Sequence, residues 1–356
     1  MKRTQLEEAL SGSSVWSRFR VGNESFVLEG KAISSEAELL FQVIYTLLND
    51  PGFRQEEYIV AMKNFETMYR QLQQDVSGAE RLYVDEFFTS EAIASGLPDW
   101  EEFKKLTLDD VVAWLKPYFM NAPLELSVVG EIDEEEIIAL AGKYLGSLPV
   151  RRYTETSQPV AQFPVEQEFE VAIDSMIDKA LVKCGWLTDD NSDISRSRRL
   201  HVLAAVFEQR LRQKMREELG KSYSPSAYSV TSRIYPGYGA LFTEVVVDNA
   251  SIDIARDVVD GIGDSFAANP VEEAELERAR EPIVTSLKDT ARTNGYWLHS
   301  VLALSSRNRQ QLEWPKTLIS DFDSISGDQI NEMARIYLRD ERRGIAVIRS
   351  ENVNSN

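Results

Sequence analysis

Residues 106–130, LTLDDVVAWLKPYFMNAPLELSVVG, and residues 325–349, ISGDQINEMARIYLRDERRGIAVIR, carry one pattern twice in this chain, 219 positions apart. Each stretch opens with an apolar residue and a hydroxyl side chain, a common start of a helix. Each continues with the apolar period of an amphipathic helix and closes on a short apolar run typical of a buried strand. The repeated helix and strand predict two homologous α+β domains.

The same offset relates two further pairs of segments. It places residues 47–51 on residues 266–270, where in both cases a helical pattern stops just before a proline. It also places residues 26–28 on residues 245–247, two apolar runs that favour strands. Three segments in one register and in the same order indicate an internal repeat.

The repeat predicts two domains, residues 1–158 and residues 159–356, each a mostly antiparallel sheet packed against helices. Residues 150–165 hold prolines and polar residues without periodicity, which indicates a linker. The second copy contains two strands and a long helix, residues 168–219, for which the first copy has no counterpart. We therefore expect the first domain to be incomplete at its N-terminus. Because a half-domain leaves a sheet edge and a core face uncovered, we expect this chain to be a piece of a longer polypeptide, and a naturally shortened first domain is the alternative.

Composition excludes several classes of protein. The 356 residues include 58 acidic and 39 basic side chains, a formal net charge of −19, which argues against binding to nucleic-acid phosphates. A single cysteine excludes an internal disulfide. No apolar run approaches the roughly 18 residues of a membrane-spanning helix. The two histidines, His201 and His299, are far apart and neither H-x-x-E-H nor H-E-x-x-H occurs, so we expect no zinc site in this chain.

The stretch that carries chemistry is residues 211–224, LRQKMREELGKSYS. Gly220 is placed as the glycine that ends a helix, with Arg216 one turn earlier and Tyr223 just beyond. Both side chains are hydrogen-bond donors that can bind a backbone carbonyl or an oxyanion. From spacing alone the alternative stays open that Arg216 compensates the helix dipole and Tyr223 is an ordinary strand aromatic.

This stretch resembles the pitrilysin/insulysin family of zinc metallopeptidases, the inverzincins, whose C-terminal halves carry an Arg and a Tyr seven residues apart. Four other segments are similar to parts of the same family: residues 107–115, 126–133, 144–149 and 294–298. The resemblance covers the chain from about Phe26 to Ile348.

The resemblance implies an enzyme of four homologous α+β domains in two halves that enclose a chamber. The zinc site, H-x-x-E-H plus a distal Glu, belongs to the N-terminal half, which is the implied partner along with a peptide substrate. This chain resembles the C-terminal half: residues 1–158 are similar to the third domain without its opening strands and helix, and residues 159–356 to the complete fourth domain. Tyr223 is therefore expected to stabilise the oxyanion and Arg216 to bind the substrate backbone. Without H-x-x-E-H, we expect no zinc and no peptidase activity from this chain alone.

Two alternatives stay open: the non-zinc Arg/Tyr subunit of a two-chain peptidase of this family, and a non-enzymatic core-type scaffold subunit as in respiratory complexes. The compartment is open between bacterial periplasm and cytoplasm. Tyr235 and Tyr238, in a predicted hairpin turn, are a weaker hypothesis for contacts with a peptide. Arg196, Arg198 and Arg199 form a basic spot at the start of the long helix, which we expect to be a solvated helix face.

Overall fold

The computed structural model describes residues 3–89, 96–152, 160–220 and 225–351. They form two compact units. Unit 1 comprises Met1–Phe65, Glu101–Thr156 and Thr293–Leu312, and unit 2 comprises Glu66–Trp100, Ser157–Arg292 and Glu313–Asn356. The boundary predicted between residues 158 and 159 separates the two copies of the sequence repeat, and it stays a prediction. The compact units follow a different division, since each draws one segment from the other side of that boundary.

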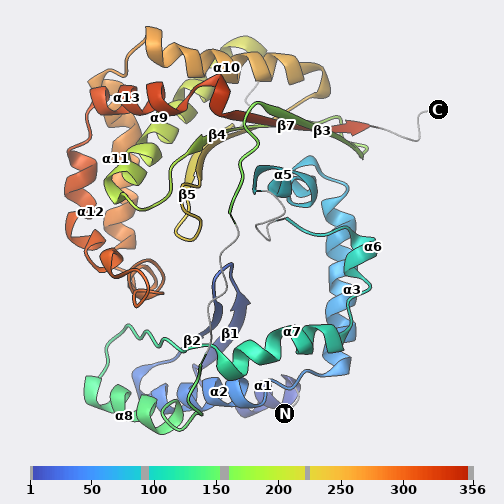
Figure 1. Cartoon of the computed structure of the whole chain (residues 1–356), viewed down its shortest axis with the longest axis vertical. Coiled ribbons are helices and arrows are strands. Elements are labelled where there is room, and N and C mark those ends of the chain that lie inside the picture. Colours follow the sequence, from blue (N-terminus) through green and yellow to red (C-terminus); the bar gives the residue numbers. More distant parts are fainter. Residues whose placement is uncertain (1–2, 90–95, 153–159, 221–224, 352–356) are drawn as a thin grey trace. The chain divides into compact units, whose positions relative to one another are not determined.

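Unit 2 is built on a five-stranded mixed sheet with the order β3-β7-β4-β6-β5 (Figure 1). Only β3 and β7 pair in parallel, so the predicted α+β class with a mostly antiparallel sheet is confirmed for this unit. The strands are β3 (Gln167–Asp174), β4 (Ala180–Thr188), β5 (Ser226–Thr231), β6 (Gly239–Val247) and β7 (Arg343–Glu351).

One face of this sheet carries the main core of unit 2. Helices α9, α10 and α13 pack against this face, with α10 and α13 above the strands in Figure 1, and buried side chains such as Leu203, Val259 and Ile330 fill the space against the strands. The helices of this part are α9 (Ile194–Leu219), α10 (Ile252–Ala268), α11 (Glu273–Thr290), α12 (Trp314–Asp323) and α13 (Gly327–Tyr337). The short 3-10 turns are η3 (Asn249–Ser251) and η6 (Asp340–Arg342).

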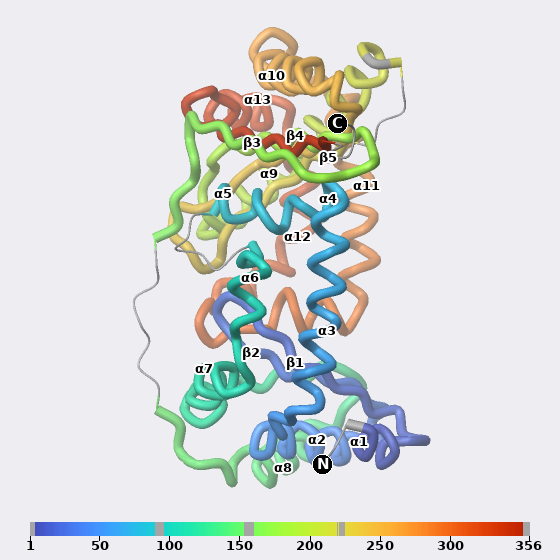
Figure 2. The backbone as a smooth tube through the Cα atoms, turned by 90° about the vertical axis from the view of Figure 1, so that its right-hand side faces the viewer, coloured from blue at the N-terminus to red at the C-terminus, as the bar shows by residue number. Residues whose placement is uncertain are grey.

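The opposite face of the sheet is covered by a segment from the first half of the chain (Figure 2). The sequence predicts one helix from about 79 to 90, but the structure breaks it into α4 (Val76–Ala79), the π-helical turn η2 (Glu80–Val84) and α5 (Asp85–Thr89). Val84 and Phe88 are buried against Phe242 and Ile348 of the sheet. Helix periodicity alone could not show that this segment belongs to the second sheet.

Unit 1 contains a two-stranded antiparallel sheet, β1 (Trp16–Val21) and β2 (Phe26–Lys31), packed against helices. Its helical elements are α1 (Arg3–Ala9), η1 (Ser34–Glu36), α2 (Ala37–Asn49), α7 (Leu108–Asn121), α8 (Glu134–Tyr144), η4 (Tyr296–Leu302) and η5 (Arg309–Leu312). Helices α3 (Gln55–Leu72) and α6 (Trp100–Phe103) contribute residues to both units. The strand predicted for residues 124–129 is wrong, because these residues join no strand ladder within the described part of the chain.

Corresponding elements follow the repeat. Thr107 and Ser326, 219 positions apart, both cap their helices through capping boxes. The turns η1 and η3 are only 215 positions apart, however, and α10 has 17 residues where α2 has 13. The four extra residues add about one helical turn. The strands before these helices therefore correspond at an offset of 215, and the predicted match of residues 26–28 with 245–247 is four positions off.

Candidate functional site

Helix α9 carries the predicted site at its C-terminal end. The helix starts where the Asp193 side chain accepts a hydrogen bond from the Arg196 N–H at 3.0 Å. It ends at Gly220, whose φ of 62° is the left-handed conformation that glycine adopts without steric cost. The Gly220 N–H donates to the Arg216 carbonyl at 3.1 Å. The predicted helix end is thus confirmed.

Buried residues fix the last turns of α9 in the core. Leu211 and Met215 are fully buried, whereas Arg216 in the last turn is exposed. Tyr223 lies outside the described residues. The described chain resumes at residue 225, and the Ala227 N–H near the start of β5 donates to a Glu208 carboxylate oxygen at 3.3 Å. The helix and the strand on either side of Tyr223 are therefore tied to each other.

Tyr235 and Tyr238 are both buried, in a small cluster with Phe163. The Tyr238 hydroxyl donates to the Phe88 carbonyl at 2.9 Å, and burial raises the pKa of Tyr238. Tyr238 therefore joins the hairpin to the segment that covers the sheet, and Tyr235 packs beside it, with ring centroids 6.5 Å apart. Their contact with a peptide stays a prediction.

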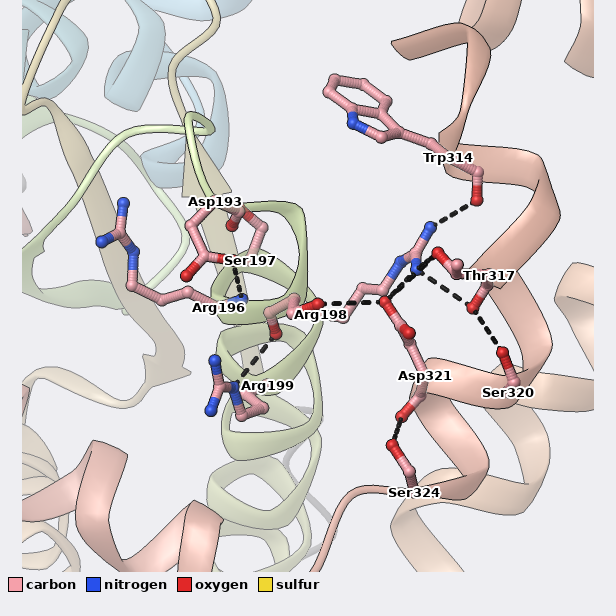
Figure 3. Close-up of polar contacts among 11 residues, drawn as sticks. Asp193, Arg196, Ser197, Arg198, Arg199, Trp314, Thr317, Ser320, Asp321 and Ser324 are labelled. Carbon is pink, nitrogen blue, oxygen red and sulfur yellow. Dashed lines mark hydrogen bonds and ion pairs between the residues drawn. The ribbon is translucent and has the colours of Figure 1, made fainter. Parts of the chain in front are cut away.

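The basic spot at the start of α9 differs from the expectation at one position. Arg198 is buried, and Figure 3 shows its guanidinium directed at α12. It donates to the Trp314 carbonyl at 2.8 Å and the Thr317 hydroxyl at 2.9 Å, and forms an ion pair with Asp321. The prediction of a solvated face is wrong for Arg198, because this side chain joins two helices.

Sequence reasoning missed a polar cluster between the sheet and the covering segment. Lys183 of β4 is buried, with its ammonium 2.9 Å from a Glu244 oxygen and 3.0 Å from the Tyr228 hydroxyl. It also forms an ion pair with Glu80 of η2, and the Tyr228 hydroxyl donates to Glu244. The one available signal was a lone Lys in the otherwise apolar strand ALVKCGWLT.

The charges within this cluster follow from its contacts. Burial lowers the pKa of Lys183, but Tyr228, Glu244 and Glu80 outweigh burial and raise it above its ordinary value. Burial raises the pKa of Glu244, but Lys183 and the Tyr228 hydrogen bond outweigh burial and lower it. Burial raises the pKa of Glu80, which Lys183 offsets only in part. Lys183 and Glu244 therefore form the charged centre of the cluster.

A catalytic zinc site takes three protein ligands. His201 packs its ring edge-on against Phe322, with centroids 6.1 Å apart. The Nε2 of His299 lies 3.0 Å from an oxygen of Glu29. Within the described ranges, no group of three or more His, Cys, Asp or Glu side chains is placed to hold a metal. In the same ranges, no helix is both long and apolar enough to cross a membrane.

Residues 105–283, half of the chain, match the family described as the peptidase M16 inactive domain. The chain therefore belongs to the M16 peptidase family. Within that family it carries the domain type named inactive, in agreement with the resemblance found in the sequence.

Known relatives agree with this assignment. The chloroplastic stromal processing peptidase of Oryza sativa subsp. indica is 20% identical over 338 residues, which cover 80% of this chain. This chain spans only about a quarter, 27%, of that relative.

Two solved structures share the fold. The peptidase M16 inactive domain from Pseudomonas fluorescens superposes with a TM-score of 0.78 at 14% identity, covering 99% of this chain and 84% of that one. A chain of complex III2 from Candida albicans gives a TM-score of 0.72 at 13% identity, covering 96% and 83% of the two chains. At such identities the likeness concerns the fold alone.

Proposed function

We propose that this chain is the substrate-holding, C-terminal-type half of a zinc-dependent endopeptidase that degrades peptides inside a closed chamber. The observation that carries the proposal is the match to the peptidase M16 inactive domain, because the matched residues include the end of α9 with Arg216, Gly220 and Tyr223. On its own the chain has no peptidase activity in this proposal.

The two donors have separate tasks. Tyr223 donates a hydrogen bond to the oxyanion that develops on the scissile carbonyl, and Arg216 binds a carbonyl of the substrate backbone. The packing of Leu211 and Met215 supports this role for Arg216, because a rigid helix end holds its backbone while the side chain stays exposed. A donor that is held in place before the reaction needs no reorganisation during it.

The metal belongs to a zinc-bearing M16 half, on the same polypeptide or on a partner subunit. The small share of the rice peptidase that this chain spans supports the single-polypeptide form, because most of that relative lies outside the match. When bound, zinc activates the attacking water. The present chain binds the peptide in this proposal and supplies no ligand to the zinc.

The test combines this chain with the H-x-x-E-H-containing M16 half encoded in the same genome and measures cleavage of quenched fluorogenic peptides. Tyr223→Phe is expected to lower kcat by about 10²–10³-fold. The matched control is Arg212→Lys, because Arg212 lies one turn before Arg216 and pairs with Glu208. An unchanged kcat for Tyr223→Phe, with an active wild-type assembly, refutes the assignment.

A second candidate is the non-zinc subunit of a two-chain peptidase. The likeness to the Pseudomonas fluorescens chain supports it, because the present chain covers most of that separate chain. A neighbouring gene with H-x-x-E-H, and co-purification of its product, favour this form. The core-type scaffold role takes its support from the complex III2 likeness. It predicts a stable assembly whose function survives Tyr223→Phe.

A further inference from the structure

We propose that Glu80 and Glu244 share one bound proton, and that this proton holds the covering segment, residues 76–89, on the sheet of unit 2. Glu80 belongs to η2 within this segment, and Glu244 belongs to β6 of the sheet. The two carboxyl groups thus form a proton-binding site between two parts of unit 2. The inference is independent of the catalytic roles proposed for Arg216 and Tyr223.

The first observation is an imbalance of charge at this site. The ammonium of Lys183 forms an ion pair with Glu80 and lies 2.9 Å from an oxygen of Glu244. The exposed fractions of the side chains are 6% for Lys183, 16% for Glu80 and 24% for Glu244. One ammonium balances one carboxylate. A second ionised carboxylate beside the first would be a largely buried charge without a partner of its own, which is strongly unfavourable.

The second observation is the hydrogen bonding of the two carboxyl groups. A hydrogen bond joins them, and two ionised carboxylates can only accept, so this bond requires a proton. Glu244 also accepts from the Tyr228 hydroxyl, which stabilises its ionised form. The proton therefore resides on Glu80, which donates to Glu244. The directions of the two pKa shifts agree, because burial raises the pKa of Glu80, whereas Lys183 and Tyr228 outweigh burial at Glu244 and lower its pKa.

Other titratable groups act on the same site. Besides Lys183 of β4 and Tyr228 of β5, they are Arg81 of η2, Asp85 of α5 and Tyr238 of the hairpin, while β7 faces the segment with apolar side chains. Burial raises the pKa of Tyr238, which keeps this phenol protonated at neutral pH. Burial also raises the pKa of Asp85, and Lys183 and Arg81 act against that rise. Asp85 is therefore the group that an experiment must distinguish from Glu80.

The shared proton makes the attachment of the covering segment depend on pH. When the segment leaves the sheet, Glu80 is exposed to water and titrates near its ordinary pKa of 4.5. The attached segment keeps the proton to a higher pH, so the attached state binds more protons above that value. Rising pH therefore favours detachment, by at most about tenfold in the equilibrium constant per pH unit, until the attached state also loses the proton.

Amide hydrogen exchange of the full chain between about pH 5 and 8, corrected for the intrinsic rate at each pH, tests the proposal. In the wild type, the opening constant of residues 76–89 is expected to rise with pH, by at most about tenfold per unit. Glu80→Gln retains a donor toward Glu244 and cannot ionise, so its opening constant should be independent of pH. Asp85→Asn is the matched control and should keep the wild-type rise.

Each outcome decides for or against the shared proton. A rise in the wild type and in Asp85→Asn, together with a constant value in Glu80→Gln, supports the proposal. A wild-type opening constant that does not change with pH overturns it, and so does a rise that persists in Glu80→Gln or disappears in Asp85→Asn. Failure of Glu80→Gln to fold also counts against it, because an amide can replace a protonated carboxyl group in these hydrogen bonds.

Discussion

The ammonium of Lys183 lies 2.9 Å from the carboxylate of Glu244, on the neighbouring strand of the unit 2 sheet. Glu80 approaches the same ammonium from the segment that covers this face. The contact therefore fixes where an early segment of the chain sits on a sheet formed much later in the sequence.

Replacement of Lys183 by an uncharged residue should lower the stability of unit 2. Lys183→Met leaves Glu80 and Glu244 in a buried site without a counter-charge, so we expect a loss of about 3–5 kcal/mol in the free energy of unfolding. Urea denaturation measures it. Lys183→Met combined with Glu244→Gln should recover part of the loss. If Lys183→Met alone is as stable as the wild type, the cluster contributes nothing to the free energy of unfolding.

The contact between α9 and α12 gives a second prediction. Arg198→Met removes the buried guanidinium that binds α12, and we expect a loss of about 3 kcal/mol. Arg199→Met is the matched control, because Arg199 is the adjacent residue and bonds only the Ser195 carbonyl of its own helix among the bonds described. Its effect should stay within about 0.5 kcal/mol. Equal effects of the two variants, measured by urea denaturation, would contradict the anchoring role.

The single cysteine provides a clean probe of the sheet. Cys184 is fully buried in β4, and burial raises the pKa of its thiol to about 12. At pH 8 the native protein should therefore leave the thiol-specific reagent DTNB unreacted over hours, because the thiolate is the reactive form. The protein in concentrated urea should release one equivalent of thiol. Rapid reaction of the native chain would mean that the sheet opens readily.

Alkaline pH should weaken unit 2 through Tyr337. Burial and the hydrogen bond to Asp189, 2.6 Å away, raise the pKa of Tyr337 to about 12. The unfolded chain loses this proton near pH 10 while the folded chain retains it, so the unfolded state binds fewer protons between about pH 10 and 12. Stability should fall across this window, by at most about 1.4 kcal/mol per pH unit from this group.

Tyr337→Phe is the control for that pH dependence. The variant lacks the ionisable group, so its unfolding free energy should fall less steeply than that of the wild type between pH 10 and 12. Identical slopes in denaturant titrations would exclude a contribution from Tyr337.

Local signals explain what could be predicted from the sequence. The end of α9 follows from the glycine at 220, and the structure confirms the predicted end of this helix at Leu219. The capping boxes of α7 and α13 mark the repeat in the same way. These signals lie within a few residues of the element they define, so one sequence is sufficient to recognise them.

Long-range contacts explain what could not be predicted. The covering role of residues 76–89 depends on strands about 100 to 270 positions later, and nothing in their own periodicity identifies that sheet. The partners of Lys183 come from three other elements. Residues 124–129 have the composition of a strand, but a strand also needs neighbouring strands. Their counterpart in unit 2, β7, has β3 and β4 as its neighbours.

The position of β7 has a consequence for how the chain is made. This strand is the last described element, yet it is an interior strand of its sheet, between β3 and β4. A ribosome that stops before residue 343 therefore releases a polypeptide in which β3 has lost its only neighbour and β4 has lost one of two. The sheet of unit 2 therefore cannot form completely until β7 has left the ribosome. Cellular quality control would remove chains that stop earlier as unfolded.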